Sequence, residues 1–270
     1  MRRIVHLSDI HFGRTDCVVV ERLAETIRKL EPNVVVVSGD LTQRARRKQF
    51  AEAQAFLGRL PRPQIVVPGN HDVPLYNVLK RFFEPLGNYK EYITADLAPF
   101  YSDAEIAVIG INTARSLTFK SGRVNNEQID QIRLRLDHLN EDVMKMVVTH
   151  HPFDLPDGYD DDAIVGRARE MMPKIAECGA DVFLSGHLHV SSVTNSAHRY
   201  RLDNGRAALV IQAGTAASTR GRGEANSFNL IEAERPFLTV KRFECNVPAN
   251  GFALATSEKF TQTERGWARM

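Results

Sequence analysis

Side chains that bind metal ions recur in short clusters along the first two thirds of the sequence. The clusters are Asp9-x-His11, Gly39-Asp40, Gly69-Asn70-His71-Asp72, His150 and Gly186-His187-x-His189. Their carboxylate, amide and imidazole groups offer oxygen and nitrogen atoms only, a set that suits Mn²⁺, Fe²⁺ or Fe³⁺, Zn²⁺ and Co²⁺ and does not select copper(I). The first chemistry that the sequence indicates is that of a transition-metal centre.

Each cluster directly follows a predicted strand, and this order brings the clusters together. Residues 33–38 form a β-branched run that is typical of a buried strand, and Asp40 follows just after it. A charge at the end of a buried strand needs partners, and the carboxyl ends of strands in an α/β sheet gather in one crevice. We therefore expect Asp40 to be shared by two ions. The first would bind Asp9, His11, Asp40 and His189, and the second Asp40, Asn70, His150 and His187.

Apolar periodicity predicts the elements that position these clusters. Strands are expected at the N-terminus and over 34–37, 64–68, 105–111, 143–149 and 181–185. Helices are expected over 20–30, with Asp16 as the N-cap, and over 50–60, 75–83, 129–139 and around 171–175. Antiparallel strands over 208–213, 227–234 and 237–244 close the pattern. Repeated strand–helix units with a β-rich end indicate a layered α/β fold.

The last part of the chain has weaker periodicity. Residues 246–270 are predicted to form an extended tail with at most one short element, outside a single domain of residues 1–245. The tail would serve as a lid or as a contact in a homo-oligomer, and the sequence leaves both open.

Composition limits the classes of function. The chain has 270 residues, 43% of them hydrophobic, and a net charge of +2, so charge alone indicates neither a nucleic-acid footprint nor a polybasic membrane anchor. Three widely spaced cysteines argue against a disulfide framework and a thiolate metal site. The sequence shows no secretory signal and no apolar run of about 18 residues. These features predict a cytoplasmic protein that acts on small molecules and has no transmembrane segment.

The ordered motifs resemble those of the calcineurin-like metallophosphoesterase superfamily, most nearly its class III cyclic-nucleotide phosphodiesterase branch. The resemblance covers residues 9–189, and Gly122-Arg123 with Glu127-Gln128 is similar to a helix start in that branch. It implies a four-layer α-β-β-α sandwich, with two mixed β-sheets flanked by helices and the active site at the carboxyl ends of the strands. It also implies two transition-metal ions (Mn, Fe, Zn or Co) with the ligands given above, and His71 as the catalytic group.

The charge of such a centre suits a phosphodiester. Two divalent cations, two carboxylates and one bridging hydroxide leave about +1, and a phosphodiester carries one negative charge. We expect hydrolysis of a small diester, with a 3′,5′-cyclic nucleotide as the first candidate, through attack by the bridging hydroxide. His71 would protonate the leaving oxygen or stabilise phosphoryl charge, and Asp72 would orient His71 or raise its pKa.

Several alternatives stay open at this stage. The same site would serve a glycerophosphodiester, a phospholipid head group or a nucleotide-sugar lipid, and a scaffold that has lost its chemistry is a rival from another class. Asn70 and His71 are expected to contact substrate, together with Arg220 and Arg222 on a glycine-spaced loop. The basic run over 44–48 is typical of a solvated helix start, with phosphate binding as its alternative. His151 would orient a ligand or face the substrate.

Overall fold

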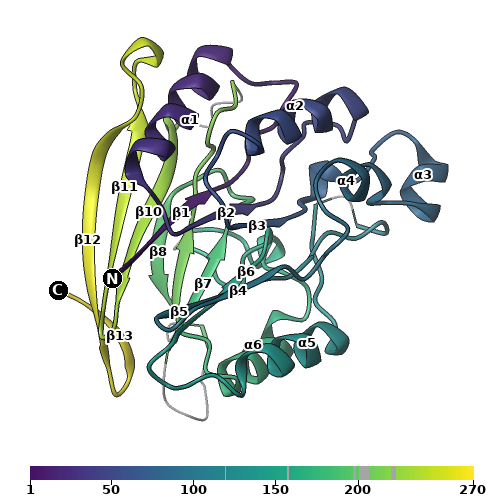
Figure 1. Ribbon diagram of the computed structural model, residues 1–270. Coiled ribbons are helices and arrows are strands. Elements are labelled where there is room, and N and C mark those ends of the chain that lie inside the picture. The colour runs from purple at the N-terminus through teal and green to yellow at the C-terminus, as the bar shows by residue number, and fades with distance from the viewer. Residues whose placement is uncertain (119, 157, 197–198, 201–206, 220–222) are drawn as a thin grey trace.

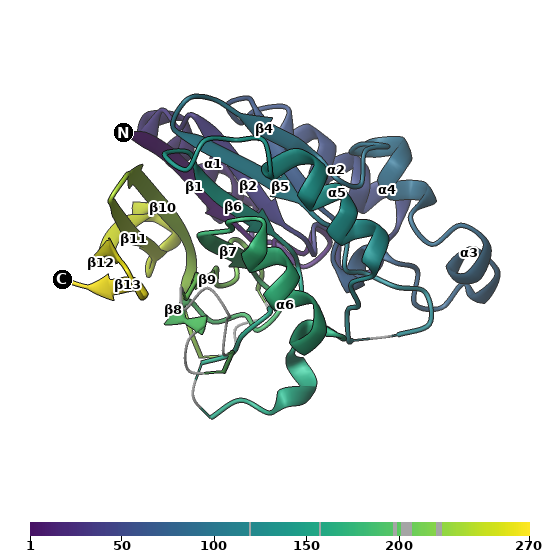
Figure 2. The ribbon, with the colours of Figure 1, turned by 90° about the horizontal axis from the view of Figure 1, so that it is seen from below.

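The fold contains two β-sheets packed face to face, with helices on both outer sides (Figure 1). The computed structural model describes residues 1–118, 120–156, 158–196, 199–200, 207–219 and 223–270. Figure 2 shows the same layers from below. The arrangement confirms the predicted α-β-β-α sandwich with two mixed sheets.

The first sheet has seven strands in the order β13-β12-β11-β10-β1-β2-β3. Its parallel part consists of β1 (Arg2–Leu7), β2 (Val34–Ser38) and β3 (Gln64–Val67). Its antiparallel part consists of β10 (Asn226–Glu234), β11 (Phe237–Cys245), β12 (Ala253–Thr263) and β13 (Gly266–Arg269). The three parallel strands all end at the same edge of this sheet, which is where the first clusters lie.

The second sheet has six strands in the order β4-β5-β6-β7-β9-β8. They are β4 (Phe100–Ser102), β5 (Ile106–Gly110), β6 (Met144–Val148), β7 (Val182–Ser185), β8 (Ser192–Asn195) and β9 (Leu209–Gln212). Strands β5, β6, β7 and β9 are parallel, so the prediction that 208–213 is antiparallel to its neighbours holds only for its pairing with β8.

Three apolar cores hold the layers together. One lies between the sheets and is built from alternate strand residues such as Ile4, Val36 and Val108. The second packs α1 (Cys17–Leu30) and α2 (Arg47–Leu57) on the first sheet, and the third packs α5 (Asn126–Leu136) and α6 (Ala168–Glu177) on the second. The parallel strands of the two sheets therefore bury both faces along most of their length, and the ligand clusters lie at their ends.

The helices agree with their sequence signals except near residue 80. The Asp16 side chain accepts hydrogen bonds from the backbone of Val18 and Val19, as expected for the N-cap of α1. The helix predicted over 75–83 is shorter, since α3 contains only Val78–Phe83, and α4 (Gly87–Tyr92) follows it. In both views α3 projects from the body of the molecule (Figures 1 and 2).

Residues after Cys245 differ from the predicted tail. They form β12 and β13, which extend the first sheet, and Phe260 and Trp267 enter the core between the sheets. The periodicity was weak because much of β12 is exposed on both faces, so apolar residues do not alternate there.

Candidate metal centre

Loops after five strands meet at one end of the sandwich. Backbone hydrogen bonds join the loop after β1 to the loop after β2, from Asp9 N to Gly39 O (3.1 Å) and from His11 N to Asp40 O (3.0 Å). In the second sheet, Gly186 N donates to His150 O at 3.1 Å. Main-chain contacts thus join the clusters within each sheet, and the hydrogen bonds from His71 N to Asp40 Oδ1 (2.8 Å) and from His187 N to Asp9 Oδ2 (3.0 Å) complete the assembly.

One group of donor atoms surrounds the end of β1. Asp9, His11, Asp40 and His189 are buried, and one ligand-type atom from each lies within 4.8 Å of the others. His189 Nε2 lies 3.2 Å from Asp9 Oδ1 and 3.4 Å from His11 Nε2, and His11 Nε2 lies 3.8 Å from Asp40 Oδ2. These are the four residues that the sequence assigned to one ion.

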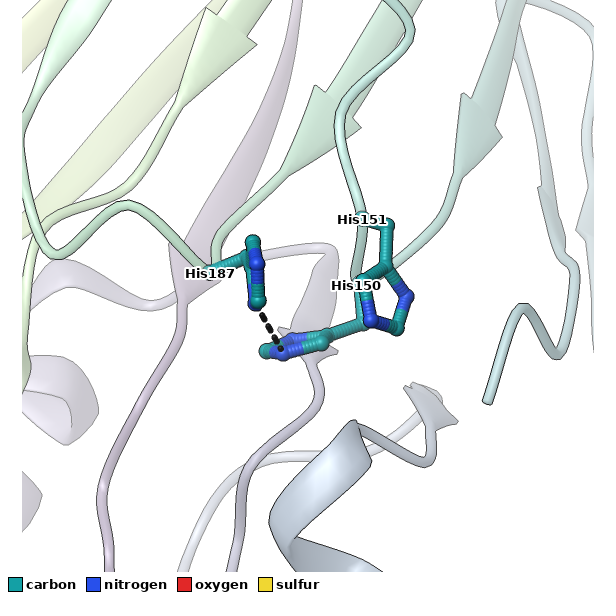
Figure 3. Close-up of side chains that lie close together, drawn as sticks. All are labelled: His150, His151 and His187. Carbon is teal, nitrogen blue, oxygen red and sulfur yellow. Dashed lines mark hydrogen bonds between the residues drawn. The ribbon is translucent and has the colours of Figure 1, made fainter. Parts of the chain in front are cut away.

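A second group lies beside the first. Asn70 Oδ1 lies 3.1 Å from His150 Nε2 and 3.2 Å from His187 Nδ1, and the two histidine nitrogens are 3.3 Å apart, a contact drawn in Figure 3. Asp40 completes this group, because its Oδ1 lies 3.4 Å from His150 Nε2. Asp40 therefore directs one oxygen to each group.

The backbone at the strand ends is left-handed at most of these residues. The φ angles are positive at Asp9, His11, Asp40, His187 and His189, between 52° and 73°. Residues other than glycine rarely adopt this conformation, although Asp and His do so more often than most. Backbone strain of this kind is concentrated at functional sites in proteins.

The donor set fits two transition-metal ions. Asp9 Oδ1 is buried and has no hydrogen-bond partner within the described part of the chain, although it lies beside the ring nitrogens of His11 and His189. His150 Nδ1 donates to Ser38 O at 2.8 Å, which leaves its Nε2 bare and directed at Asn70 and Asp40.

Protonation states agree with this fit. Burial lowers the pKa of His187 to about 4, with His150 contributing, so its ring is neutral near pH 7 as a ligand must be. Burial opposes the charge of Asp40, but His150, His11 and His71 together hold the pKa of this carboxyl below its ordinary value.

His71 lies at the mouth of the centre, half-buried. Its backbone N donates to Asp40 Oδ1 at 2.8 Å, and its Nε2 lies 4.0 Å from Asp40 Oδ2. Its Nδ1 lies 3.0 Å from the carbonyl oxygen of Gln43, an acceptor, and 3.2 Å from the amide nitrogen of the same residue, a donor. Nδ1 also lies 3.3 Å from Arg44 Nη1, a second donor, so the tautomer of the ring decides whether Nδ1 donates to the Gln43 carbonyl or accepts from these two nitrogens.

The Asp72 carboxylate bonds to the loop after β2 and to Gly69, and the expectation that it orients His71 or raises its pKa stays a prediction. This carboxylate accepts hydrogen bonds from the backbone of Leu41 (3.1 Å), Thr42 (2.8 Å) and Gly69 (3.0 Å) and from the Thr42 hydroxyl. Burial, with the nearby Asp40 charge, raises the pKa of Asp72 to about 6. Asp72 holds the Asp40 loop against the short 3₁₀ helix Asn70–Asp72.

His151 is fully buried and does not line the cavity over the centre, so a role in orienting a ligand stays the prediction for it. Its Nδ1 lies 2.8 Å from the Thr113 hydroxyl, and its ring packs against those of His150 and His187 (Figure 3). Arg220 and Arg222, expected to bind substrate, lie outside the described residues.

A cavity of about 460 Å³ opens onto the centre. Its wall is formed by Asp40, Gln43, Arg44, Asn70, His71, Val73, Leu75, Lys120, Ala163, His187, Leu188 and His189. Sequence reasoning missed Gln43 and Lys120. The position of Gln43, three residues after Asp40 in the same loop, could have indicated it. Lys120 is far from the ligands in the sequence and reaches the site only through the tertiary fold.

Comparison with known proteins identifies the family. The family model described as calcineurin-like phosphoesterase matches residues 2–191. The chain belongs to this family. Membership confirms the resemblance inferred from the motifs, and this calcineurin-like chain has a candidate site for two metal ions.

Individual relatives are more distant. A glycerophosphodiester phosphodiesterase, GpdQ, from Enterobacter lignolyticus is 31% identical over 80 residues, which cover 26% of this chain and 29% of GpdQ. A purple acid phosphatase from yellow lupin superposes with a TM-score of 0.69 at 13% identity, over 96% of this chain and 53% of that one. A dimetal phosphatase from Danio rerio gives 0.65 at 13% identity, over 97% and 99%. The two structures support the fold.

Within the described residues, the structure contains no helix that is both long and apolar enough to span a membrane.

Proposed function

We propose that this chain is a hydrolase of small phosphodiesters that uses two metal ions held at the strand ends. The observation that supports it most strongly is Asp40, whose two oxygens face two separate donor groups. When bound, two divalent ions would lower the pKa of a water between them, orient the phosphate and offset charge on the attacking and leaving oxygens. Asp9, His11 and His189 would hold the first ion, and Asn70, His150 and His187 the second, with Asp40 shared.

His71 is the proposed proton donor. When Nδ1 donates to the Gln43 carbonyl, a second proton on Nε2 makes the ring a cation at the cavity wall. That proton would pass to the leaving oxygen, and the charge of the ring would stabilise the phosphoryl group before transfer. Asn70 and Lys120 would help to orient the phosphate from the same cavity.

The substrate is proposed as a class with two leading members. A 3′,5′-cyclic nucleotide follows from the resemblance of the motifs to the class III branch. A glycerophosphodiester is favoured by the GpdQ similarity, because that relative is named for this activity. The rival proposal, a scaffold without chemistry, is opposed by the completeness of the donor set.

Metal analysis tests the centre. Protein prepared without chelator, or reconstituted with Mn²⁺ or Zn²⁺, should contain close to two ions per chain. A reproducible content near zero after reconstitution would refute the two-metal centre.

A substrate panel tests the reaction. Turnover should be measured for cyclic nucleotides, glycerophosphodiesters, a model aryl diester and the matching monoesters. We expect diesters to be hydrolysed faster than monoesters with the same leaving group. A preference for monoesters would replace the proposed phosphodiesterase with a phosphatase, and no turnover in metal-loaded protein would favour the scaffold.

A further inference from the structure

An apolar surface lies beside the mouth of the metal centre and is not used by the proposed chemistry. Helix α3 and the residue before its N-cap expose large apolar side chains, and a neighbouring loop adds one more. The exposed fractions are 75% for Tyr76, 61% for Val78, 71% for Leu79, 52% for Phe82, 83% for Phe83 and 79% for Leu117. We call these six residues the apolar lip. Contiguous exposed apolar groups of this kind mark a binding surface.

Arg81 holds the two segments of the apolar lip together. Its guanidinium donates to the backbone carbonyls of Pro74 (2.9 Å), Ser116 (2.7 Å) and Thr118 (2.6 Å), and the side chain is buried. Because a buried guanidinium makes strong hydrogen bonds to these carbonyls, Arg81 fixes α3 against the loop that contains Ser116 and Thr118. The lip is therefore anchored from below, while its apolar groups face outward.

The apolar lip is continuous with the cavity over the metal centre. Leu75 and Lys120 line the cavity. Leu75 directly precedes Tyr76 of the lip in the sequence, and Lys120 follows Leu117 of the lip by three residues. Arg44, also in the cavity wall, lies with its guanidinium 6.0 Å from the centre of the Tyr76 ring. Whatever covers the lip is thus placed next to the site.

The surroundings of the lip are basic. Arg44, Lys80 on α3 itself and Lys120 lie along it, and the acids nearest to these cations are Glu84 at the C-cap of α3 and, across the cavity, Asp162 next to Ala163. An apolar surface bordered by Lys and Arg complements an anionic bilayer, in which apolar side chains enter the acyl boundary and cations remain at the head groups.

A second copy of the chain fits this surface less well. A two-fold contact would place the same basic groups opposite each other, because both copies use the same patch. The six residues of the lip are also far fewer than the roughly 20–30 residues per side of a standard interface. A bilayer imposes neither condition.

We propose that the apolar lip docks this protein onto anionic phospholipid bilayers, with Tyr76, Val78, Leu79, Phe82, Phe83 and Leu117 entering the interface. Docking in this way directs the cavity toward the head-group layer. Binding to the bilayer does not depend on hydrolysis and can be measured without it.

Vesicle flotation with the full chain tests the proposal. Wild type should float with phosphatidylcholine vesicles that contain phosphatidylglycerol, and much less with phosphatidylcholine alone or at high salt. The double variant Leu79→Ser with Phe83→Ser should reduce the bound fraction at least about tenfold. The matched control, Leu134→Ser with Leu254→Ser, removes two side chains exposed by 74% and 54% far from the lip and should bind as wild type.

Two further measurements separate the outcomes. Lys80→Glu should weaken vesicle binding more than Lys29→Glu on α1 does. In the Phe83→Trp variant, the fluorescence of the new tryptophan should shift to the blue on mixing with anionic vesicles, whereas the emission of the buried Trp267 in wild type should not change. Turnover of a water-soluble diester should be unchanged in the Leu79/Phe83 variant, which shows an intact fold.

The proposal is overturned if wild type does not float with anionic vesicles, or if the lip and control variants bind equally. It is also overturned if the lip variants leave vesicle binding unchanged and only lower the particle mass of the protein in sedimentation velocity, because a second copy of the chain then covers the lip. Failure of the phosphodiesterase proposal would leave flotation unaffected, so the two are distinguishable.

Discussion

The two oxygens of Asp40 face the two donor groups of the candidate metal centre. Oδ2 lies 3.8 Å from His11 Nε2 in one group, and Oδ1 lies 3.4 Å from His150 Nε2 in the other. Oδ1 also accepts a hydrogen bond from the backbone of His71, so the same carboxylate positions the proposed proton donor. A change at this residue should therefore affect metal binding and turnover together.

Replacing Asp40 by Asn tests this coupling. Asn tolerates the left-handed backbone and keeps an acceptor for His71 N, but it removes the shared charge. We expect metal content to fall from about two ions toward zero while circular dichroism shows a folded chain. Asp130→Asn, an exposed change on α5, is the control. Loss of a single ion with the other retained would show that Asp40 is not the bridge.

Replacing His71 by Ala should leave both ions bound and lower turnover by about 10²–10⁴-fold for a diester with an alkoxide leaving group. The loss should be much smaller for a p-nitrophenyl diester, because that leaving group needs no proton. The exposed His138→Ala variant should behave as wild type. Equal losses for the two leaving groups would contradict proton donation by His71.

At the scale of elements, the carboxyl ends of the strands are held by contacts that leave little space. A Cβ atom on Gly186 would overlap the Ser8 hydroxyl and lie 2.6 Å from Asp9 Oδ2. Gly186 N also donates to the backbone oxygen of His150. The absence of a side chain here allows the end of β7 to approach the end of β1, which belongs to the other sheet.

The variant Gly186→Ala should therefore separate the two sheets locally. We expect lower metal content and a reduced melting temperature, measured by metal analysis and thermal unfolding. Gly58→Ala is the matched control, since its φ is ordinary and the nearest atom to an added Cβ is 3.4 Å away. Normal metal binding by Gly186→Ala would show that the approach of β7 to β1 is not required for the site.

Asp72 stabilises the junction between the loops after β2 and β3. Asp72→Ala would leave the buried N–H groups of Leu41, Thr42 and Gly69 without an acceptor. We expect a loss of about 3–5 kcal/mol in the free energy of unfolding, measured in denaturant, because each unpaired buried donor is costly. Asp96→Ala, which removes the acceptor of one exposed N–H, should cost far less. A similar cost for both would argue against this bracing role.

The sequence predicted the strands that end in ligands because each is a short apolar run followed by a polar cluster. The same reasoning paired Asp72 with His71, and adjacency in sequence does not reveal that the Asp72 carboxylate accepts from the backbone N–H groups of Leu41 and Thr42, 31 and 30 residues earlier. Lys120 was missed for a similar reason, since it reaches the cavity only when the loop after β5 folds over the site.

At the scale of the whole molecule, the two sheets stay together because side chains from both fill the space between them. Residues of β12 and β13 contribute to this core although the sequence predicted a tail there. The Trp267 indole is buried, and its N–H donates to the backbone oxygen of Asp181 at 3.1 Å, which connects the edge of the first sheet to the second. The end of the chain therefore acts as part of the sandwich.

Trp267→Ala should destabilise the whole sandwich. The change removes a buried aromatic side chain and leaves a cavity between the sheets, so we expect the free energy of unfolding to fall by about 3–5 kcal/mol in a denaturant titration. Leu254→Ala, at a half-exposed position of β12, should change it by less than about 1 kcal/mol. Equal small effects would mean that residues 246–270 pack only loosely, as the predicted tail would. A large effect confined to Trp267 requires β12 and β13 to fold together with the strands that carry the metal centre.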